Sequence, residues 1–202
     1  MSNTAYLQDL GRKLHNFRPW QQTAFATAMA QRSLPNFGLF AEVTGFGDLD
    51  ELKHCLNMLW DHSAGLQSAK NFERLLERLE QQTPDIDDFD MYGVYPALDA
   101  IVSLTTAVHC AMQPSAEEAL SNGRLSLSTI GRLLGQTEAQ ELRGTELSQY
   151  IDQHPLTLQH LDFIDEVCEL LAQGKPNQET RKKLRELALN SGVSELGISM
   201  EE

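Results

Sequence analysis

The chain of 202 residues lacks the marks of a membrane or secreted protein. No apolar run reaches the roughly 18 residues that a membrane-spanning helix needs, and residues 1–14 have no apolar core of the signal-peptide kind. Cysteine is scarce as well: Cys55, Cys110 and Cys168 are far apart and form no C-x-x-C pair, which argues against a disulfide framework and a cysteine-rich zinc site. We therefore expect a soluble, cytoplasmic protein without membrane attachment, in which the cysteines are small core residues.

Positive charge is also scarce. The 16 Lys and Arg residues are outnumbered by 29 Asp and Glu residues, which gives a formal net charge of −13 at pH 7. Because affinity for nucleic acids comes largely from basic side chains that neutralise phosphates, this balance argues against a DNA or RNA partner. The exception is a basic patch of Arg181, Lys182, Lys183 and Arg185, which predicts a solvated helix face. A more specific hypothesis is that the helix carrying this patch docks near residues 85–99, within one chain or across a dimer.

The sequence has no sustained period-two alternation bounded by hairpin turns, so it predicts no strand. It also has no internal repeat and no low-complexity linker. Apolar residues recur instead at helical spacing, often after a good N-cap or a first-turn proline. The predicted helices cover residues 5–16, 19–33, 49–65, 72–79, 96–113, 115–122, 125–141, 155–171 and 177–192. Residues 34–48 predict a broken connection, in which "TGFGD" makes a tight turn with Asp48 as N-cap rather than an anion site.

One predicted helix carries no charge. Residues 100–113 contain no Asp, Glu, Lys or Arg, and a helix that is apolar all round belongs in the middle of a fold. Tyr95 precedes Pro96 and is disfavoured in the α region, so we place the helix start at Pro96. The predicted fold is all-α, an irregular multi-helix bundle around a buried central helix of about residues 96–113. We expect one domain over residues 1–202, with the last ten or so residues as a tail.

His109 lies on this predicted central helix. At about 100° per residue it shares a mostly apolar stripe with Leu98, Val102, Thr105 and Met112. We expect a core histidine satisfied by one or two hydrogen bonds.

An acidic segment leads into the same helix. Asp85, Asp87, Asp88, Asp90 and Asp99 lie within residues 84–100 without a single Lys or Arg. Like charges this close repel, so we consider three explanations: a helix N-terminus with a solvated acidic surface, a divalent cation such as Mg²⁺, Ca²⁺ or Mn²⁺, or a basic protein partner. The spacing is not that of an EF-hand loop. The candidate metal ligands are Asp87, Asp88, Asp90 and Asp99, and the candidate ligand- or partner-binding residues add Tyr92 and Tyr95.

No motif completes an active site. "ELKH", Glu51 to His54, matches one element of a carboxylate di-iron bundle, but it stands alone and falls opposite the leucine stripe of its helix. No Ser/His/Asp or Cys/His nucleophilic constellation can be assembled from spacing.

Four stretches together carry a resemblance: "DDFDMYGVYPALDA", "TGFGD", "LPNF" and the closing "ELGI". They resemble the YjaG-like family of proteobacterial proteins, which is classed as a domain of unknown function. The likeness runs over nearly the whole chain, and the YGVYPA-x-DA block is its specific part. The resemblance implies a bacterial, cytoplasmic, all-helical protein. It brings no established activity, cofactor or catalytic residue, so it assigns no role to any position here.

Two function classes follow from these observations. The favoured one is a non-enzymatic binding or interaction protein that self-associates as a homo-oligomer and whose acidic surface meets a basic partner. The alternative is a metal-dependent enzyme, such as a hydrolase, that uses the aspartates of residues 85–99 as ligands, with Tyr92 or Tyr95 lining the pocket. Interaction is favoured because no motif completes an active site.

Overall fold

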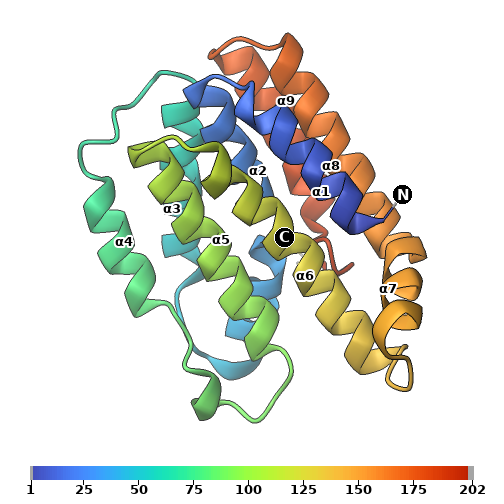
Figure 1. Cartoon of the computed structure of the whole chain (residues 1–202). Helices are drawn as coiled ribbons and strands as arrows, with labels where there is room; N and C mark the ends of the chain where they lie inside the picture. The colour runs from blue at the N-terminus through green and yellow to red at the C-terminus, as the bar shows by residue number, and fades with distance from the viewer. Residues whose placement is uncertain (1, 200–202) are drawn as a thin grey trace.

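The computed structural model describes residues 2–199 and is helical throughout (Figure 1). The α-helices are α1 (Asn3–His15), α2 (Pro19–Thr44), α3 (Leu49–Ser63), α4 (Phe72–Gln81), α5 (Val94–Met112), α6 (Ala116–Thr137), α7 (Gly144–Gln153), α8 (Pro155–Gln173) and α9 (Gln178–Leu189), with short 3₁₀ helices η1 (Ile86–Asp88) and η2 (Asn190–Gly192). Within these residues the only β-type pairing is an isolated bridge between Val193 and Ser199. The predicted all-α multi-helix bundle is confirmed.

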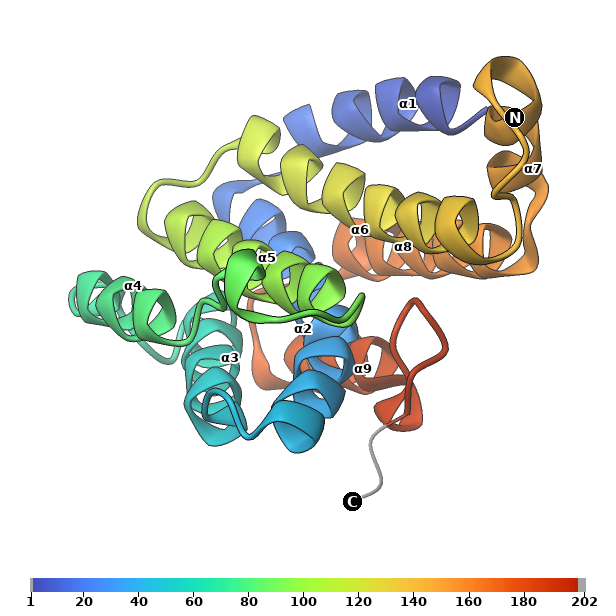
Figure 2. The same ribbon diagram turned by 90° about the horizontal axis from the view of Figure 1, so that it is seen from below.

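The centre of the bundle is the pair α2 and α5. The hydroxyl of Thr23, near the start of α2, donates to the carbonyl of Cys110, near the end of α5, at 3.1 Å. Further along α2, the Asn122 amide of α6 donates to the carbonyls of both Ala26 and Ser103, so the two central helices run antiparallel. Both helices are rich in buried alanines, which let their backbones approach closely. Figure 2 shows α1 and α6 on one side of this pair and α3 and α9 on the other.

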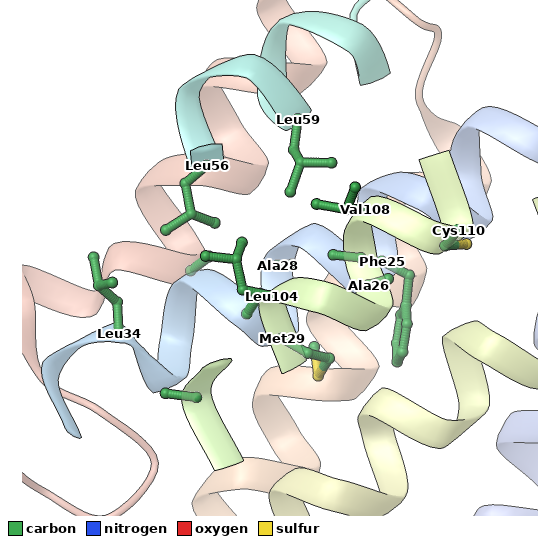
Figure 3. Close-up of a cluster of buried hydrophobic side chains, with 14 of the residues drawn as sticks. Phe25, Ala26, Ala28, Met29, Leu34, Leu56, Leu59, Leu104, Val108 and Cys110 are labelled. Atoms are coloured by element: carbon green, nitrogen blue, oxygen red, sulfur yellow. The ribbon is translucent and has the colours of Figure 1, made fainter. Parts of the chain in front are cut away.

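Large apolar side chains fill the space around the pair. Figure 3 shows this core, to which α2 contributes Phe25, Met29 and Leu34, α3 contributes Leu56 and Leu59, and α5 contributes Leu104 and Val108. Each side chain of this size stabilises the fold by about 1.5–3 kcal/mol when it is fully buried. The three helices are therefore fixed relative to one another, and with them the direction of each face of α5.

α5 is buried around most of its circumference and exposes one narrow stripe. By length and composition it is the one helix of residues 2–199 that could cross a membrane, but 67% of its apolar window is buried inside the fold, as in a core helix. The prediction of a buried central helix applies to the inner face of α5. α2 is buried more completely, because every residue from 21 to 38 is buried. The helix also begins at Val94 rather than at Pro96, because a proline in the first turn removes no N–H that the helix needs.

α2 does not end before Pro35, as the sequence predicts, but runs through it to Thr44. A proline inside a helix costs about 3 kcal/mol, because it lacks the N–H and its ring crowds the preceding turn. The same stretch buries Leu34, Phe37 and Phe40 almost completely. The burial of these three side chains offsets the cost of the proline, so tertiary packing decides where the helix ends.

The turn from α2 to α3 follows the prediction. Gly45 and Gly47 have φ values of 71° and 80°, which only glycine adopts easily. The Asp48 carboxylate accepts the N–H of Asp50 at 2.9 Å and caps α3. A Cβ atom on Gly47 would lie 2.6 Å from the ring of Phe37, so the second glycine is needed for space as well.

Three features of the second half differ from the prediction. The helix α7 lies between the predicted helices 125–141 and 155–171, where the sequence predicts none. The segments 115–122 and 125–141 form one helix, α6, whose Gly123 allows close contact with Leu10 rather than ending a helix. The predicted C-terminal tail is wrong for the described residues 193–199, because they lie against the bundle: Leu196 packs on Ile130 and Leu134 of α6. The rest of that tail, residues 200–202, lies outside the described part of the chain.

Candidate functional site

The acidic segment separates into two parts. Asp85, Asp87, Asp88 and Asp90 are exposed around η1. The Asp85 carboxylate accepts the N–H of Asp87 at 3.0 Å and caps this short helix. Local capping thus involves Asp85, and the other three carboxylates are exposed to solvent.

Asp99 is held elsewhere. Only 9% of the residue is exposed, and its Oδ2 accepts hydrogen bonds from Thr129 Oγ1 at 2.7 Å and Arg132 Nη1 at 2.9 Å, both on α6. The N-terminus of α5 is not what holds it. Within residues 2–199 no three His, Cys, Asp or Glu side chains are arranged to hold a metal ion. The structure does not bring Asp99 together with Asp87, Asp88 and Asp90.

Tyr92 and Tyr95 do lie near Asp99. Their ring centroids are 5.9 Å apart, and the Arg132 guanidinium lies 5.9 Å from the centroid of Tyr95, within cation–π range. Burial raises the pKa of Tyr92, while the nearby Arg132 charge opposes the shift. Three of the predicted binding residues thus meet around an arginine that sequence reasoning missed. We name Tyr92, Tyr95, Asp99 and Arg132 the tyrosine–arginine cluster.

From this cluster an unpartnered helix face runs along α5. Its members alternate at spacings of three and four residues, and we name them the outer face of α5: Tyr95, Leu98, Val102, Thr105, His109 and Met112. This is the a/d spacing of a helix that packs on another helix. Val102 is 43% exposed and Met112 is 37% exposed. His109 is exposed too, so the prediction of a core histidine is wrong: α2 packs on the opposite, alanine-rich face.

The residue types of this region are those of a protein–protein interface. Tyrosine and arginine are enriched at interface hot spots, and aromatic and methionine side chains in interface centres. A contiguous apolar stripe on the surface of a folded chain usually marks an interaction site. The tyrosine–arginine cluster and the outer face of α5 together form our candidate interaction site.

A second polar region is buried, and the sequence analysis did not predict it. Arg32 and Asn36 of α2 lie one turn apart and are 8% and 2% exposed. Asn36 Nδ2 donates to Glu195 Oε1 at 2.8 Å, and His160 Nε2 lies 2.7 Å from Ser126 Oγ. We name Arg32, Asn36, His160 and Glu195 the buried polar centre. The spacing of four residues between Arg32 and Asn36, which places both on one face of a helix, is the one signal that could have pointed to it.

Burial shifts the pKa values of two groups in this centre, Glu195 and His160. Burial raises the pKa of Glu195 to about 7; Asp99 adds to the rise, and hydrogen bonding from Asn36 and the charge of Arg32 oppose it. Burial lowers the pKa of His160 to about 3, and the positive charge of Arg32 adds to that shift. Near neutral pH the histidine is uncharged and the glutamate is close to half-ionised.

The buried polar centre ties distant segments together. The Arg32 guanidinium lies 3.8 Å from the centroid of the Phe163 ring and donates to the carbonyls of Leu187 at 2.8 Å and Ala188 at 3.1 Å. An arginine on the last carbonyls of a helix compensates their unpaired acceptors. The centre therefore holds the end of α9, and through Glu195 the C-terminal segment, against α2.

The predicted basic patch lies on α9, which packs against α2, α3 and α8. Arg181 Nη1 pairs with Asp61 Oδ1 of α3 at 2.7 Å. The hypothesis that this helix docks near residues 85–99 of its own chain is therefore wrong.

With this geometry described, comparison with known proteins decides the family. A family model described as "Protein of unknown function (DUF416)" matches residues 9–199. The chain belongs to the DUF416 family. The resemblance to YjaG-like proteins is confirmed, because the Escherichia coli (strain K12) protein named "Uncharacterized protein YjaG" is 31% identical over 94% of this chain and 96% of its own length.

Other DUF416 relatives agree with this assignment. An uncharacterized protein of Haemophilus influenzae Rd is 29% identical over 95% of this chain and 97% of its own length. The crystal structure of a DUF416 family protein from Shewanella baltica OS155 shares 32% sequence identity and a TM-score of 0.84, covering 94% of this chain and 98% of that one. None of these names states an activity, so the roles of residues in this DUF416 protein have to be argued from its own geometry.

Proposed function

We propose that this DUF416 protein is a non-enzymatic interaction protein that pairs with a second copy of itself through the candidate interaction site. The observation that carries the proposal is an a/d-spaced helix face, free of Asp, Glu, Lys and Arg, on which Val102, His109 and Met112 are exposed in the folded chain. Burying such a face removes apolar surface from water, which is the main favourable term in association. Tyr95 and Arg132 at one end supply side chains typical of interface hot spots.

A second copy suits this face because the face is complementary to itself. In an antiparallel two-fold arrangement, Val102 meets Thr105 of the second copy, and Tyr95 meets Met112 of the second copy. Two chains that each carry −13 repel one another, and a face without charged side chains is where they approach at the lowest electrostatic cost. Physiological salt screens the remaining repulsion beyond about 8 Å.

Two further expectations belong to this proposal. The exposed aspartates of residues 85–90 precede the N-terminus of the outer face, where they suit a basic partner protein that binds beside the pairing of two copies. We also place the protein in the cytoplasm, because Cys55, Cys110 and Cys168 are buried and free, as expected in a reducing compartment.

The test is the mass of the full chain in solution, measured by analytical ultracentrifugation. We expect wild type to sediment at twice its 22.6 kDa, and Val102→Asp to sediment as a monomer, because the new carboxylate would be buried at the centre of the pairing. Val43→Asp is the matched control, since Val43 is 62% exposed in the last turn of α2. A monomeric wild type, or identical behaviour of the two variants, would refute the pairing.

A further inference from the structure

A groove lies between α2, α3 and α9, away from the outer face of α5. Its volume is about 1050 Å³, at the upper end of the range of about 300–1,000 Å³ that is typical of small-molecule sites. α2, α3 and Leu189 at the end of α9 form its floor, while the rest of α9 and η2 form one wall (Figure 2 shows α3 and α9 beside α2). The groove is therefore large enough to take a small molecule that the candidate interaction site does not involve.

The floor of the groove is apolar. It is lined by Leu34 and Pro35 of α2, Leu49 and Leu56 of α3, and Leu189 of α9. Leu189 is 40% exposed although it is an aliphatic side chain at the end of a helix. Leu34, Pro35 and Leu56 are already buried, so a ligand with a hydrocarbon portion would exclude water mainly from Leu49 and Leu189.

The rim of the groove is basic. Lys53, Lys182 and Arg185 line it against one acidic residue, Glu186. Lys53 makes only a long, exposed contact to Asp50 at 3.6 Å. Burial lowers the pKa of Arg185, and the positive charge of Arg181 adds to that shift, although Asp61 opposes it. In a chain of net charge −13, the rim is a local excess of positive charge that an anion would compensate.

One buried polar group also lines the groove. Gln31 is 5% exposed, and its Oε1 accepts the indole N–H of Trp60 at 3.1 Å. This bond fixes the orientation of the carboxamide. Its oxygen accepts from Trp60, and its nitrogen carries two N–H donors. Among residues 2–199 no hydrogen bond occupies that nitrogen. In mostly apolar binding sites, a few polar groups held in a fixed orientation bind the polar head group of the ligand and orient it.

The wall of the groove is held in place by the buried polar centre. The bonds from Arg32 to the carbonyls of Leu187 and Ala188 fix the last turn of α9 immediately before Leu189. The site is thus built on helices and supported from behind, which is the condition for a well-defined binding geometry.

We infer that this groove binds a small amphipathic carboxylate, with its hydrocarbon chain on the leucine floor and its carboxylate at the Gln31 amide and the Arg185 rim. The inference rests on the match between an apolar floor, a basic rim and the N–H donors of the Gln31 amide, whose oxygen is taken by Trp60. The site is separate from the pairing through α5, so either can fail without the other.

Isothermal titration calorimetry of the full chain tests the inference with three probes of equal chain length: decanoate, 1-decanol and decylammonium. We expect decanoate to bind at least about tenfold more tightly than decylammonium. Arg185→Gln should weaken decanoate about fivefold, the effect of losing one partly exposed charge contact, and leave 1-decanol unchanged. Leu189→Asp should abolish binding of both decanoate and 1-decanol, because it puts a charge on the apolar floor.

Matched controls come from exposed residues elsewhere in the chain. Lys70→Gln, between α3 and α4, and Leu158→Asp, on α8, should bind all three probes as wild type does. A thermal melt of each variant confirms that it is folded. The inference is overturned if decanoate does not bind, if decylammonium binds equally well, or if the control variants lose affinity as much as Arg185→Gln and Leu189→Asp do.

Discussion

Glu195→Gln should change how the stability of this protein depends on pH. The Glu195 side chain is buried beside Asn36, Arg32 and Asp99. Burial raises its pKa from 4.5 to about 7. Between these values the folded state keeps a proton that the unfolded state has released. The contribution of Glu195 is therefore fully present below pH 4.5 and is lost as the pH rises to 7, by a total of about 3 kcal/mol.

His160 contributes with the opposite sign. Burial lowers its pKa from 6.5 to about 3, so below pH 6.5 the unfolded state binds a proton that the folded state does not. Its contribution is fully present above pH 6.5 and is lost as the pH falls to 3, by a total of about 5 kcal/mol. Between pH 4.5 and 6.5 the slopes of Glu195 and His160 cancel. Their sum predicts a nearly flat stability curve for wild type in that window.

Glutamine at position 195 retains an oxygen that can accept from Asn36 and removes the titration. The free energy of unfolding of Glu195→Gln should then rise by about 1.4 kcal/mol per pH unit between pH 4.5 and 6.5, where wild type is flat. From pH 4 to pH 8 the free energy of unfolding of the variant, relative to that of wild type, should increase by about 3 kcal/mol. Urea unfolding at constant ionic strength, followed by circular dichroism, measures both curves.

Glu80→Gln is the control, because Glu80 is exposed on α4. It should follow the wild-type curve at every pH. Parallel curves for Glu195→Gln and wild type from pH 4 to pH 8 would refute the reasoning, because the buried glutamate would then not hold its proton through that window.

Two further predictions concern the acidic segment. Asp99→Asn should lower the free energy of unfolding by about 1–3 kcal/mol, because it weakens the buried contacts to Arg132 and Thr129. Asp90→Asn, at an exposed position, is its control. It should change the free energy of unfolding by less than about 0.5 kcal/mol in the same urea titration. Millimolar Mg²⁺, Ca²⁺ or Mn²⁺ should shift the melting temperature of wild type and Asp88→Ala equally, since the aspartates do not converge; a shift seen in wild type alone would restore the metal hypothesis.

The starts of α3, α6 and α9 could be predicted from the sequence because capping is local chemistry. Ser115 caps α6 through the N–H groups of Glu117 and Glu118, and Asn177 caps α9 through the N–H of Thr180. A cap needs only residues within one turn, so its signal lies in a few letters. The course of α2 past Pro35 could not be predicted in this way, because the burial that offsets the proline comes from helices distant in the sequence.

The candidate site could be predicted only in part for the same reason. Tyr92, Tyr95 and Asp99 are close in sequence and lie together in the structure, but Arg132 comes from another helix. Both faces of α5 are apolar, so periodicity could not tell which one α2 covers, and His109 was placed on the wrong side. The buried polar centre brings residues of α2 and α8 together with the C-terminal segment, and no spacing rule joins segments so far apart.

α2 links the two proposed binding surfaces while keeping them separate. α5 and α9 pack on α2 from different sides (Figures 1 and 2). Arg32 and Asn36 project from α2 to hold α9 and residues 193–199, whereas alanines of α2 seat the inner face of α5. Ionisation of Glu195 puts a charge behind the wall of the groove, and the outer face of α5 lies on the far side of its own helix from α2. Glu195 also lies within electrostatic range of Asp99 in the tyrosine–arginine cluster. Changes of pH through 7 should therefore affect both the groove and the end of the candidate interaction site near Asp99.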